Sequence, residues 1–275
     1  MNSKKIASML SAVALMAGAS MSASAATVLD GWTLITPGET ITNIGRMNLT
    51  GGNALVTQEF NSSGLVFVGA KFTESGQIFN LSFQSEDTPG TGDGTDPVTS
   101  PESLKLTFTN VTGHVTSVSG QSFTYQFDSG SYKLTPSSNT STIYASGDII
   151  GIGGRASSTA IIGGFNGDST LLGRILSIGA GVVFKDSANN DLAADILSGK
   201  VLYEAVTNNN LANIVQNPAI CPFTVAVGNT CKSFNVASAG DAYLVRAVPE
   251  PGTLALAGFA LLGLGAARRR RTTAK

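Results

Sequence analysis

The chain has 275 residues, a formal net charge of −1 at pH 7 and 13% charged residues, about half the share of an average soluble domain. Seven of its 17 basic residues lie in the first five or the last eight positions, whereas all 18 acidic residues lie between Asp30 and Glu250. Residues 26–250 therefore hold 10 basic and 18 acidic side chains, a net charge of −8. Such a segment repels phosphate backbones, which argues against a nucleic-acid partner.

The N-terminus has the three parts of a secretory signal peptide. Lys4 and Lys5 form a basic start, and an apolar run from residue 6 to about residue 19 follows. This run is too short to span a bilayer comfortably. We therefore expect residues 1–25 to direct export and to be removed at a site of small residues, formed by Ala23, Ala25 and Ala26.

The C-terminus combines prolines, an apolar run and arginines. Residues 253–267 carry no charge and would form a helix of about 22 Å, shorter than a hydrocarbon core of about 30 Å. Proline lacks a backbone N–H, so this helix should begin after the sequence Pro249-Glu250-Pro251. We expect a short transmembrane helix that holds the chain in the membrane transiently. Its orientation is set by the positive-inside rule through a cluster of arginines, namely Arg268, Arg269, Arg270 and Arg271.

The segment VPEPGTLALAGFALLGLGAARRRR, residues 248–271, resembles the PEP-CTERM sorting signal, in which a Pro-Glu-Pro motif precedes a short transmembrane helix and an arginine cluster. The resemblance implies a Gram-negative bacterium that makes exopolysaccharide, and an exosortase that processes the chain at the inner membrane. Residues 248–275 would then be a sorting signal, comparable to the apolar tail that is removed from a GPI-anchored protein. An ordinary C-terminal membrane anchor is the alternative.

Between these ends, residues 26–247 have the pattern of an extracellular β-domain. Thr, Val and Phe are frequent, and such β-branched and aromatic residues fit a pleated, half-buried surface. In the stretch SLKLTFTN apolar and polar residues alternate strictly, which places Leu104, Leu106 and Phe108 on one face of a strand. Many short strands separated by turn residues predict an all-β fold, either a β-sandwich or a jelly-roll-like domain.

Two polar triplets are predicted to separate strands. Asp128-Ser129-Gly130 would form the turn of a hairpin, and Glu74-Ser75-Gly76 would lie between two apolar runs. A short helix is expected at residues 191–197. Further strands are expected at residues 54–60, 111–118, 142–146, 181–184, 201–207 and 242–247.

Residues 85–103 are the clearest predicted loop, because they hold three prolines and five acidic residues. Asp93 and Asp96, with nearby carbonyl groups, would suit Ca²⁺, a cation that takes six to eight oxygen ligands. Their spacing does not fit the EF-hand loop, so a solvated acidic loop is the preferred interpretation and no metal site is predicted.

Cys221 and Cys231 are the only cysteines, and both lie in the exported part, where an oxidising compartment favours a disulfide. A two-residue turn at Gly228 and Asn229 would place Cys231 opposite Ala226 instead. The bridge therefore requires a loop wider than a tight hairpin. Two free thiols are the alternative, since a zinc site would lack ligands in a chain with one histidine.

The sequence offers no catalytic constellation and no cofactor site. GIGGRA, residues 151–156, fits the pattern G-x-G-x-x-A, but no helix pattern follows it and the acidic partner is missing, so a glycine-rich turn or bulge is predicted. His114 is the one candidate imidazole base, and without a G-x-S-x-G motif it is interpreted as a surface or turn residue.

These observations favour a non-enzymatic cell-surface or matrix protein that acts in flocculation, biofilm formation or exopolysaccharide association. The stretches GAKFTESGQI, LKLTFTNVTG and YASGDIIGIGG resemble flocculation-associated members of the PEP-CTERM group. A secreted glycoside hydrolase, which needs paired carboxylates, is one alternative. A carbohydrate-binding module is another and would expose aromatic rings on one face; the candidates are Trp32, Tyr125, Tyr132 and Tyr144, although alternation places Tyr125 in the core.

Overall fold

The computed structural model describes residues 26–85, 97–98, 103–157, 166–215 and 221–247. The predicted signal peptide, the predicted sorting signal and nearly all of the acidic loop lie outside the described residues. Residues 27–246 form one compact unit.

The described chain is almost entirely β-structure, with one short helix, α2 (Ala193–Leu197). The strands are β1 (Ala26–Val28), β2 (Trp32–Ile35), β3 (Thr40–Phe60), β4 (Lys71–Ser85), β5 (Pro97–Val98), β6 (Leu104–Ser119), β7 (Ser122–Pro136), β8 (Ala145–Gly151), β9 (Gly153–Ser157), β10 (Asn166–Ile178), β11 (Val183–Lys185), β12 (Val201–Ile214) and β13 (Thr230–Ala247).

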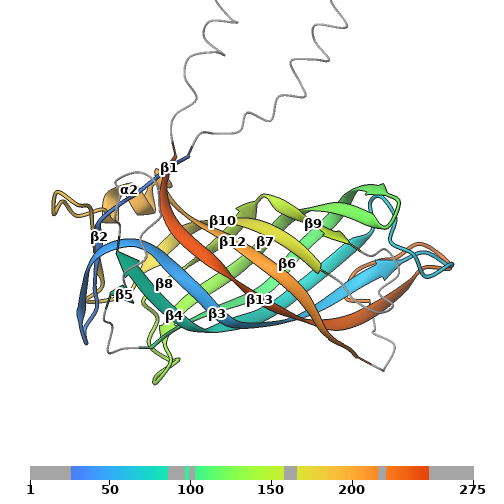
Figure 1. Cartoon of the computed structure of the whole chain (residues 1–275), viewed down its shortest axis with the longest axis horizontal. Coiled ribbons are helices and arrows are strands. Elements are labelled where there is room, and N and C mark those ends of the chain that lie inside the picture. Colours follow the sequence, from blue (N-terminus) through green and yellow to red (C-terminus); the bar gives the residue numbers. More distant parts are fainter. Residues whose placement is uncertain (1–25, 86–96, 99–102, 158–165, 216–220, 248–275) are drawn as a thin grey trace, which may run out of the picture. The chain divides into compact units, whose positions relative to one another are not determined.

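The strands form a single antiparallel sheet (Figure 1). Its order is β13-β12-β10-β8-β7-β6-β4-β3, and β13 also pairs with β3, so these eight strands of the described chain form a closed ring. The predicted all-β class is confirmed. All strands belong to one sheet, where two packed sheets or a jelly roll were expected. The reason is strand length: β3 has 21 residues and β13 has 18, enough to bend around the core and pair with each other.

The two polar triplets predicted to separate strands lie inside continuous strands, so those two predictions were wrong. Asp128-Ser129-Gly130 is part of β7, and Glu74-Ser75-Gly76 is part of β4. A glycine inside a strand can mark the close approach of another backbone. A Cβ atom on Gly130 would lie 2.9 Å from the Cα atom of Val111, and one on Gly76 would overlap the carbonyl oxygen of Asn53. These glycines therefore allow neighbouring strands to approach each other in a strongly bent sheet.

One end of the closed ring is filled by apolar side chains from β2, β11 and α2, which we call the Trp32 cap. Strand β2 pairs with β3 on one side and with β11 on the other. The Trp32 ring stacks on Phe184 with 6.1 Å between centroids and meets Phe83 edge-on at 6.4 Å. Ile196 of α2 is fully buried in the same core cluster. Burying side chains of this size stabilises the fold by about 1.5–3 kcal/mol each.

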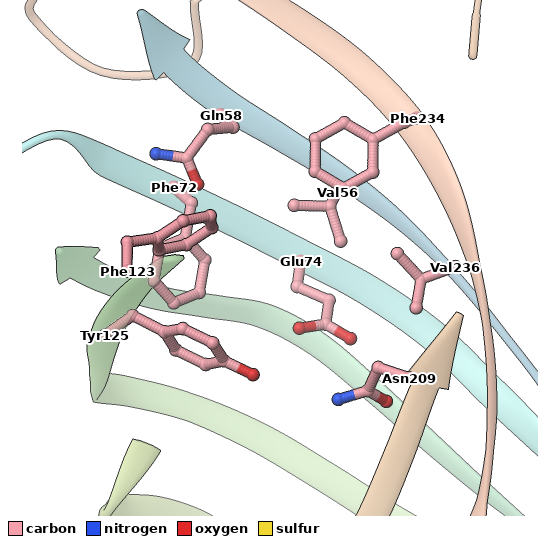
Figure 2. A pocket seen from close by; sticks show the side chains of 9 residues that line it. All are labelled: Val56, Gln58, Phe72, Glu74, Phe123, Tyr125, Asn209, Phe234 and Val236. Carbon is pink, nitrogen blue, oxygen red and sulfur yellow. The ribbon is translucent and has the colours of Figure 1, made fainter. Parts of the chain in front are cut away.

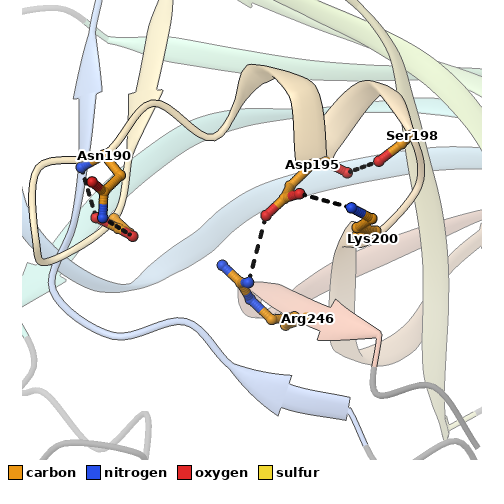
Figure 3. A network of polar contacts seen from close by, with 6 residues as sticks. Asn190, Asp195, Ser198, Lys200 and Arg246 are labelled. Atoms are coloured by element: carbon orange, nitrogen blue, oxygen red, sulfur yellow. Dashed lines mark hydrogen bonds and ion pairs between the residues drawn. The ribbon is translucent and has the colours of Figure 1, made fainter.

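The predicted helix is present but starts at Ala193, because Asp191 accepts a hydrogen bond from the Ala193 backbone N–H at 2.8 Å and so lies outside the first turn. Asp195 forms ion pairs with Lys200 at 3.4 Å and with Arg246 at 3.5 Å (Figure 3). Since Arg246 belongs to β13, the second pair ties α2 to the last strand of the ring.

The two ends of the compact unit lie next to each other at this capped end. Strand β1 is the neighbour of β13 in the sheet, and the Leu29 backbone N–H donates a hydrogen bond to the Leu244 carbonyl at 2.8 Å. The chain therefore enters and leaves the closed ring at the same end.

Candidate functional site

Side chains from all eight ring strands point inward and line two adjoining cavities. The first, which we call the Glu74 cavity, has an empty volume of about 480 Å³ including its opening to solvent. Figure 2 shows its lining residues, Val56, Gln58, Phe72, Glu74, Phe123, Tyr125, Asn209, Phe234 and Val236. The second, the Tyr132 cavity, has an empty volume of about 560 Å³ and shares Glu74 and Asn209 with the first. Polar groups are thus gathered where the two cavities meet.

Glu74 points inward because side chains alternate along β4. Phe72 and Ile78, two residues before it and four residues after it, are buried on the same face. Glu74 lies opposite Val56 of β3 and Val111 of β6, which are both buried apolar residues. The carboxylate is therefore held among apolar side chains from three adjacent strands.

Glu74 has an unusual electrostatic environment. Among the described residues, no hydrogen bond or ion pair is found for its carboxylate. Burial raises the pKa of Glu74 from 4.5 to about 7, because apolar walls disfavour the charged form. The side chain keeps part of its surface accessible, and this surface faces the cavity. The cavity thus holds an acid that is only partly ionised at neutral pH.

Asn209 is fixed by a network of hydroxyl groups on the side of the cavity opposite Glu74. Its Nδ2 donates to the Ser169 Oγ at 3.0 Å, and its Oδ1 accepts from the Ser238 Oγ at 2.7 Å and the Thr207 Oγ1 at 3.3 Å. Ser169 and Thr207 are themselves hydrogen-bonded at 2.7 Å. The network joins β10, β12 and β13, so the amide is oriented by three strands.

The polar groups of Gln58 and Tyr125 are oriented by hydrogen bonds to backbone carbonyl groups. The Gln58 Nε2 donates to the Glu59 and Lys71 carbonyls at 3.3 and 3.4 Å, while its Oε1 accepts no hydrogen bond from the described residues. The Tyr125 hydroxyl donates to the Asp168 carbonyl at 3.3 Å. Burial and then the neighbouring Glu74 carboxylate raise the pKa of Tyr125. Glu74 and Gln58 therefore leave unpaired acceptor atoms in the cavity.

Aromatic rings form one wall of the Glu74 cavity. Phe72 contacts Tyr125 and Phe127 in edge-to-face geometry, at 5.5 and 5.9 Å between centroids. Tyr125 also contacts Phe123 at 6.2 Å and Phe127 at 5.6 Å. These rings come from β4 and β7. They give the carboxylate an apolar and polarisable surrounding.

Two further tyrosines lie between the Tyr132 cavity and the Trp32 cap. The rings of Tyr132 and Tyr203 are stacked with 5.6 Å between centroids. Both hydroxyl groups are buried and find no hydrogen-bond partner within the described part of the chain. Burial raises the pKa of both tyrosines, which are therefore uncharged at neutral pH.

The outer face of β6 and β7 carries pairs of exposed hydroxyl groups, which we call the hydroxyl strip. The His114 ring lies within it and pairs with Asp128 at 3.0 Å. Hydroxyl pairs across two strands stabilise a sheet modestly. The pairs are Thr109 with Ser131 at 2.9 Å, Thr112 with Ser129 at 2.8 Å, and Thr124 with Thr116 at 2.8 Å and with Ser117 at 2.7 Å.

A disulfide joins Cys221 and Cys231, whose Cα atoms are 5.4 Å apart. Cys231 lies in β13 opposite Glu59, whereas Cys221 lies in the segment that precedes β13. The Asn229 N–H donates to the Ala226 carbonyl at 3.0 Å, so this segment ends in a turn and does not pair as a hairpin strand. The bridge therefore closes a loop wider than a tight hairpin.

The aromatic residues considered for carbohydrate binding do not form an exposed face. Trp32, Tyr132 and Tyr144 are almost fully buried, and Tyr125 lines the Glu74 cavity. The four candidate rings therefore do not form an exposed aromatic face. Glu74 is the one carboxylate that lines either cavity within the described ranges.

The glycine-rich stretch at residues 151–156 lies where β8 ends and β9 begins. Ile152 separates the two strands and has a positive φ of 67°. Its carbonyl accepts a hydrogen bond from the Phe127 N–H. The stretch is thus an irregularity between two strands that both pair with β7 and β10. Among the described residues, no group of three or more His, Cys, Asp or Glu side chains is arranged to hold a metal ion.

Several predicted sites lie outside the described residues and stay predictions. Ala23 and Ala25 belong to them, whereas Ala26 begins β1. The possible calcium ligands Asp93 and Asp96 also lie there. So do the sorting residues Pro249, Glu250, Pro251, Arg268, Arg269, Arg270 and Arg271.

Comparison with known families gives one match, which covers residues 247–271 and is described as the PEP-CTERM protein-sorting motif. The chain carries a PEP-CTERM motif. This motif implies an exported protein that is processed by an exosortase and carried across the inner membrane to the cell surface. No match to a curated protein or to a solved structure was found.

The PEP-CTERM motif begins at the last residue of β13, so the closed ring and the motif are adjacent along the chain. In the part that the structure describes, no helix has the length and apolar character needed to span a membrane. The short transmembrane helix predicted within the motif lies outside that part.

Sequence reasoning missed Glu74, Gln58 and Asn209 as candidate functional residues. The signal for Glu74 was the two-residue alternation from Phe72 to Ile78, which continues through the triplet interpreted as a turn. Gln58 continues the alternation of β3 after Val56 in the same way. Asn209 continues the alternation of β12 after Tyr203 and Ala205, but it stands in the polar run Asn208-Asn209-Asn210, where no apolar residue marks the inward face.

Proposed function

We propose that the mature protein is a non-enzymatic component of the surface or extracellular matrix of a Gram-negative bacterium. There it associates with exopolysaccharide and promotes flocculation or biofilm formation. The observation that carries the proposal is the hydroxyl strip on an exported protein. Ser and Thr hydroxyls both donate and accept hydrogen bonds, as sugar hydroxyls do. A row of them therefore matches the chemistry of a polysaccharide chain.

The geometry of the strip supports this role. Its hydroxyls are exposed, yet cross-strand pairs hold them in place along β6 and β7. Groups that are ordered before binding lose less conformational entropy when a ligand chain is bound. Each hydroxyl has capacity for a further hydrogen bond beyond its partner. The strip thus offers an ordered hydrogen-bonding surface.

A deletion strain tests the biological role. We expect cells without the gene to settle and form biofilm several-fold less than the parent strain, and the wild-type gene to restore both. A strip variant with Thr109→Val, Thr112→Val and Thr116→Val should export normally but restore neither, because valine keeps the shape of threonine and removes the hydroxyl. Cosedimentation of the protein with the strain's own purified polysaccharide measures binding directly.

The matched control is Thr40→Val, Thr42→Val and Thr50→Val, which makes the same change at exposed positions of β3. This control should restore settling and bind polysaccharide like the wild type. Normal flocculation and biofilm in the deletion strain would refute the proposed role. Equal polysaccharide binding by the strip variant and the control would show that the hydroxyl strip is not the binding surface.

A further inference from the structure

We propose that the Glu74 cavity binds a small organic ammonium ion, with the Glu74 carboxylate as its counter-ion. This inference goes beyond the proposed surface function and does not rest on it. It starts from a carboxylate that faces a cavity and has no hydrogen-bond or ion-pair partner among the described residues. Several other acidic side chains of the domain are paired, for example Asp241 with Arg46 at 3.7 Å and Asp168 with Arg155 at 2.9 Å.

The charge of the lining determines the charge of the ligand. Neither cavity is lined by Lys, Arg or His from the described residues, so Glu74 has no internal cation to neutralise it. Gln58 adds a neutral acceptor, its free Oε1. A lining that contributes a carboxylate and a free amide oxygen favours a cation that donates hydrogen bonds.

The walls of the cavity indicate an organic cation and not a metal ion. Ca²⁺ and Mg²⁺ require about six oxygen ligands. The cavity supplies one carboxylate and the amide oxygen of Gln58, whereas the Tyr125 hydroxyl and the Asn209 amide oxygen already have hydrogen-bond partners. Aromatic rings attract ammonium groups through their π faces and pack against alkyl groups. Figure 2 shows the Glu74 carboxylate between Tyr125 and Asn209, with Phe72 and Phe123 on the same side as Tyr125. This arrangement suits an amine with a short alkyl chain.

The other titratable groups facing the cavities do not compete for the cation. Tyr125 and Tyr132 of β7 and Tyr203 of β12 all have raised pKa values, so they stay neutral when Glu74 ionises. Strands β3, β10 and β13 contribute only neutral side chains to the lining. Ligand binding should therefore follow the ionisation of Glu74 alone.

Calorimetric titration of the full-length protein in a mild detergent tests the proposal, with n-propylammonium as the probe and 1-propanol as its neutral counterpart. We expect n-propylammonium to bind at pH 8.5 and to bind about 30-fold more weakly at pH 5.5, because only the ionised fraction of Glu74 is competent. The amine itself stays protonated at both pH values. 1-Propanol should bind more weakly than the amine at pH 8.5 and show no such pH dependence.

Two variants separate the cavity from general charge effects. Glu74→Gln keeps the shape and should weaken n-propylammonium binding at least tenfold at pH 8.5. Glu204→Gln removes the same charge from β12, at a position that lines neither cavity, and should bind like the wild type. Thermal unfolding of each variant verifies that it is folded. The proposal is overturned if the wild type does not bind the amine at pH 8.5, if binding is independent of pH, or if Glu74→Gln binds it equally well.

Discussion

Glu74 lowers the stability of the folded state when it is ionised. Its pKa is 4.5 in an unpaired, solvated state and about 7 in the folded protein. Between these values the folded state binds more protons than the unfolded state, so the free energy of unfolding falls as pH rises and levels off above pH 7. A neutral side chain of the same shape would avoid this cost. Residues that reduce stability in this way are characteristic of functional sites.

We therefore predict that Glu74→Gln changes the pH dependence of stability. The variant should match the wild type near pH 4.5 and be more stable by up to about 3 kcal/mol at pH 8, because glutamine carries no charge to desolvate. Urea unfolding at the two pH values measures the difference. Glu204→Gln is the control and should show a smaller change, since Glu204 is less deeply buried. Equal stability of Glu74→Gln and wild type at pH 8 would contradict the prediction.

The candidate site could be predicted from the sequence only in part. Alternation placed Tyr125 in the core, and it lines the Glu74 cavity. The inward position of Glu74 was missed because Glu-Ser-Gly is a typical turn sequence, and local propensity outweighed the alternation around it. The cavity itself depends on residues from β3, β4, β7, β12 and β13, which meet only after the sheet has closed. No local sequence pattern shows which of these distant strands will come together.

The length of the strands explains why alternation was a useful signal for strands and why two turns were wrongly predicted inside β4 and β7. Alternation of apolar residues identified parts of β3, β4, β6, β7, β12 and β13 but missed β2, β9 and β10. The two predicted breaks fell at glycines that allow close packing. In β4 the pairing with β6 shifts its register between Glu74 and Gly76. The strand bends at this point instead of turning back. A glycine that permits a bend and a glycine that forms a turn look identical in one sequence.

Gly76→Ala tests this interpretation of β4. The added Cβ atom would overlap the Asn53 carbonyl oxygen and lie 2.7 Å from the Ala54 Cα atom, so the backbones of β3 and β4 would have to separate. We expect a loss of about 1–3 kcal/mol in the free energy of unfolding, typical of overpacking. Gln77→Ala, at the next position of β4, should cost less than 1 kcal/mol because that side chain is only half-buried. An equal loss in the free energy of unfolding for Gly76→Ala and Gln77→Ala would refute a special role for Gly76.

At the scale of the molecule, the ring depends on a contact between its first and last strands. In the closing pair, Phe60 of β3 lies opposite Thr230 of β13, and Met47 lies opposite Ala242. This pairing leaves neither strand with a free edge inside the ring, and free edges promote association between chains. The all-β class was predictable from composition and alternation. The closure was not, because it depends on which distant strands pair.

A pair of truncations tests how the ring and the PEP-CTERM motif depend on each other. A chain of residues 27–246 contains every pairing of the ring and should unfold cooperatively. A chain of residues 27–229 lacks β13 and should show no cooperative transition, since β3 and β12 both lose a partner. Thermal unfolding followed by near-ultraviolet circular dichroism distinguishes them. Cooperative unfolding of the shorter chain would contradict the proposed importance of closure.

The position of β13 along the chain has a consequence for export. In a chain exported from its N-terminus, the strand that closes the ring crosses the membrane after all other strands of the ring, and the PEP-CTERM motif starts at its final residue. Before β13 is exported, β3 has no partner strand on the edge that later pairs with β13, and the interior around Glu74 is still open. In such a chain the ring can close only when the residues next to the sorting signal have been exported. An exosortase that cuts at this signal acts on a chain whose last strand has just become available.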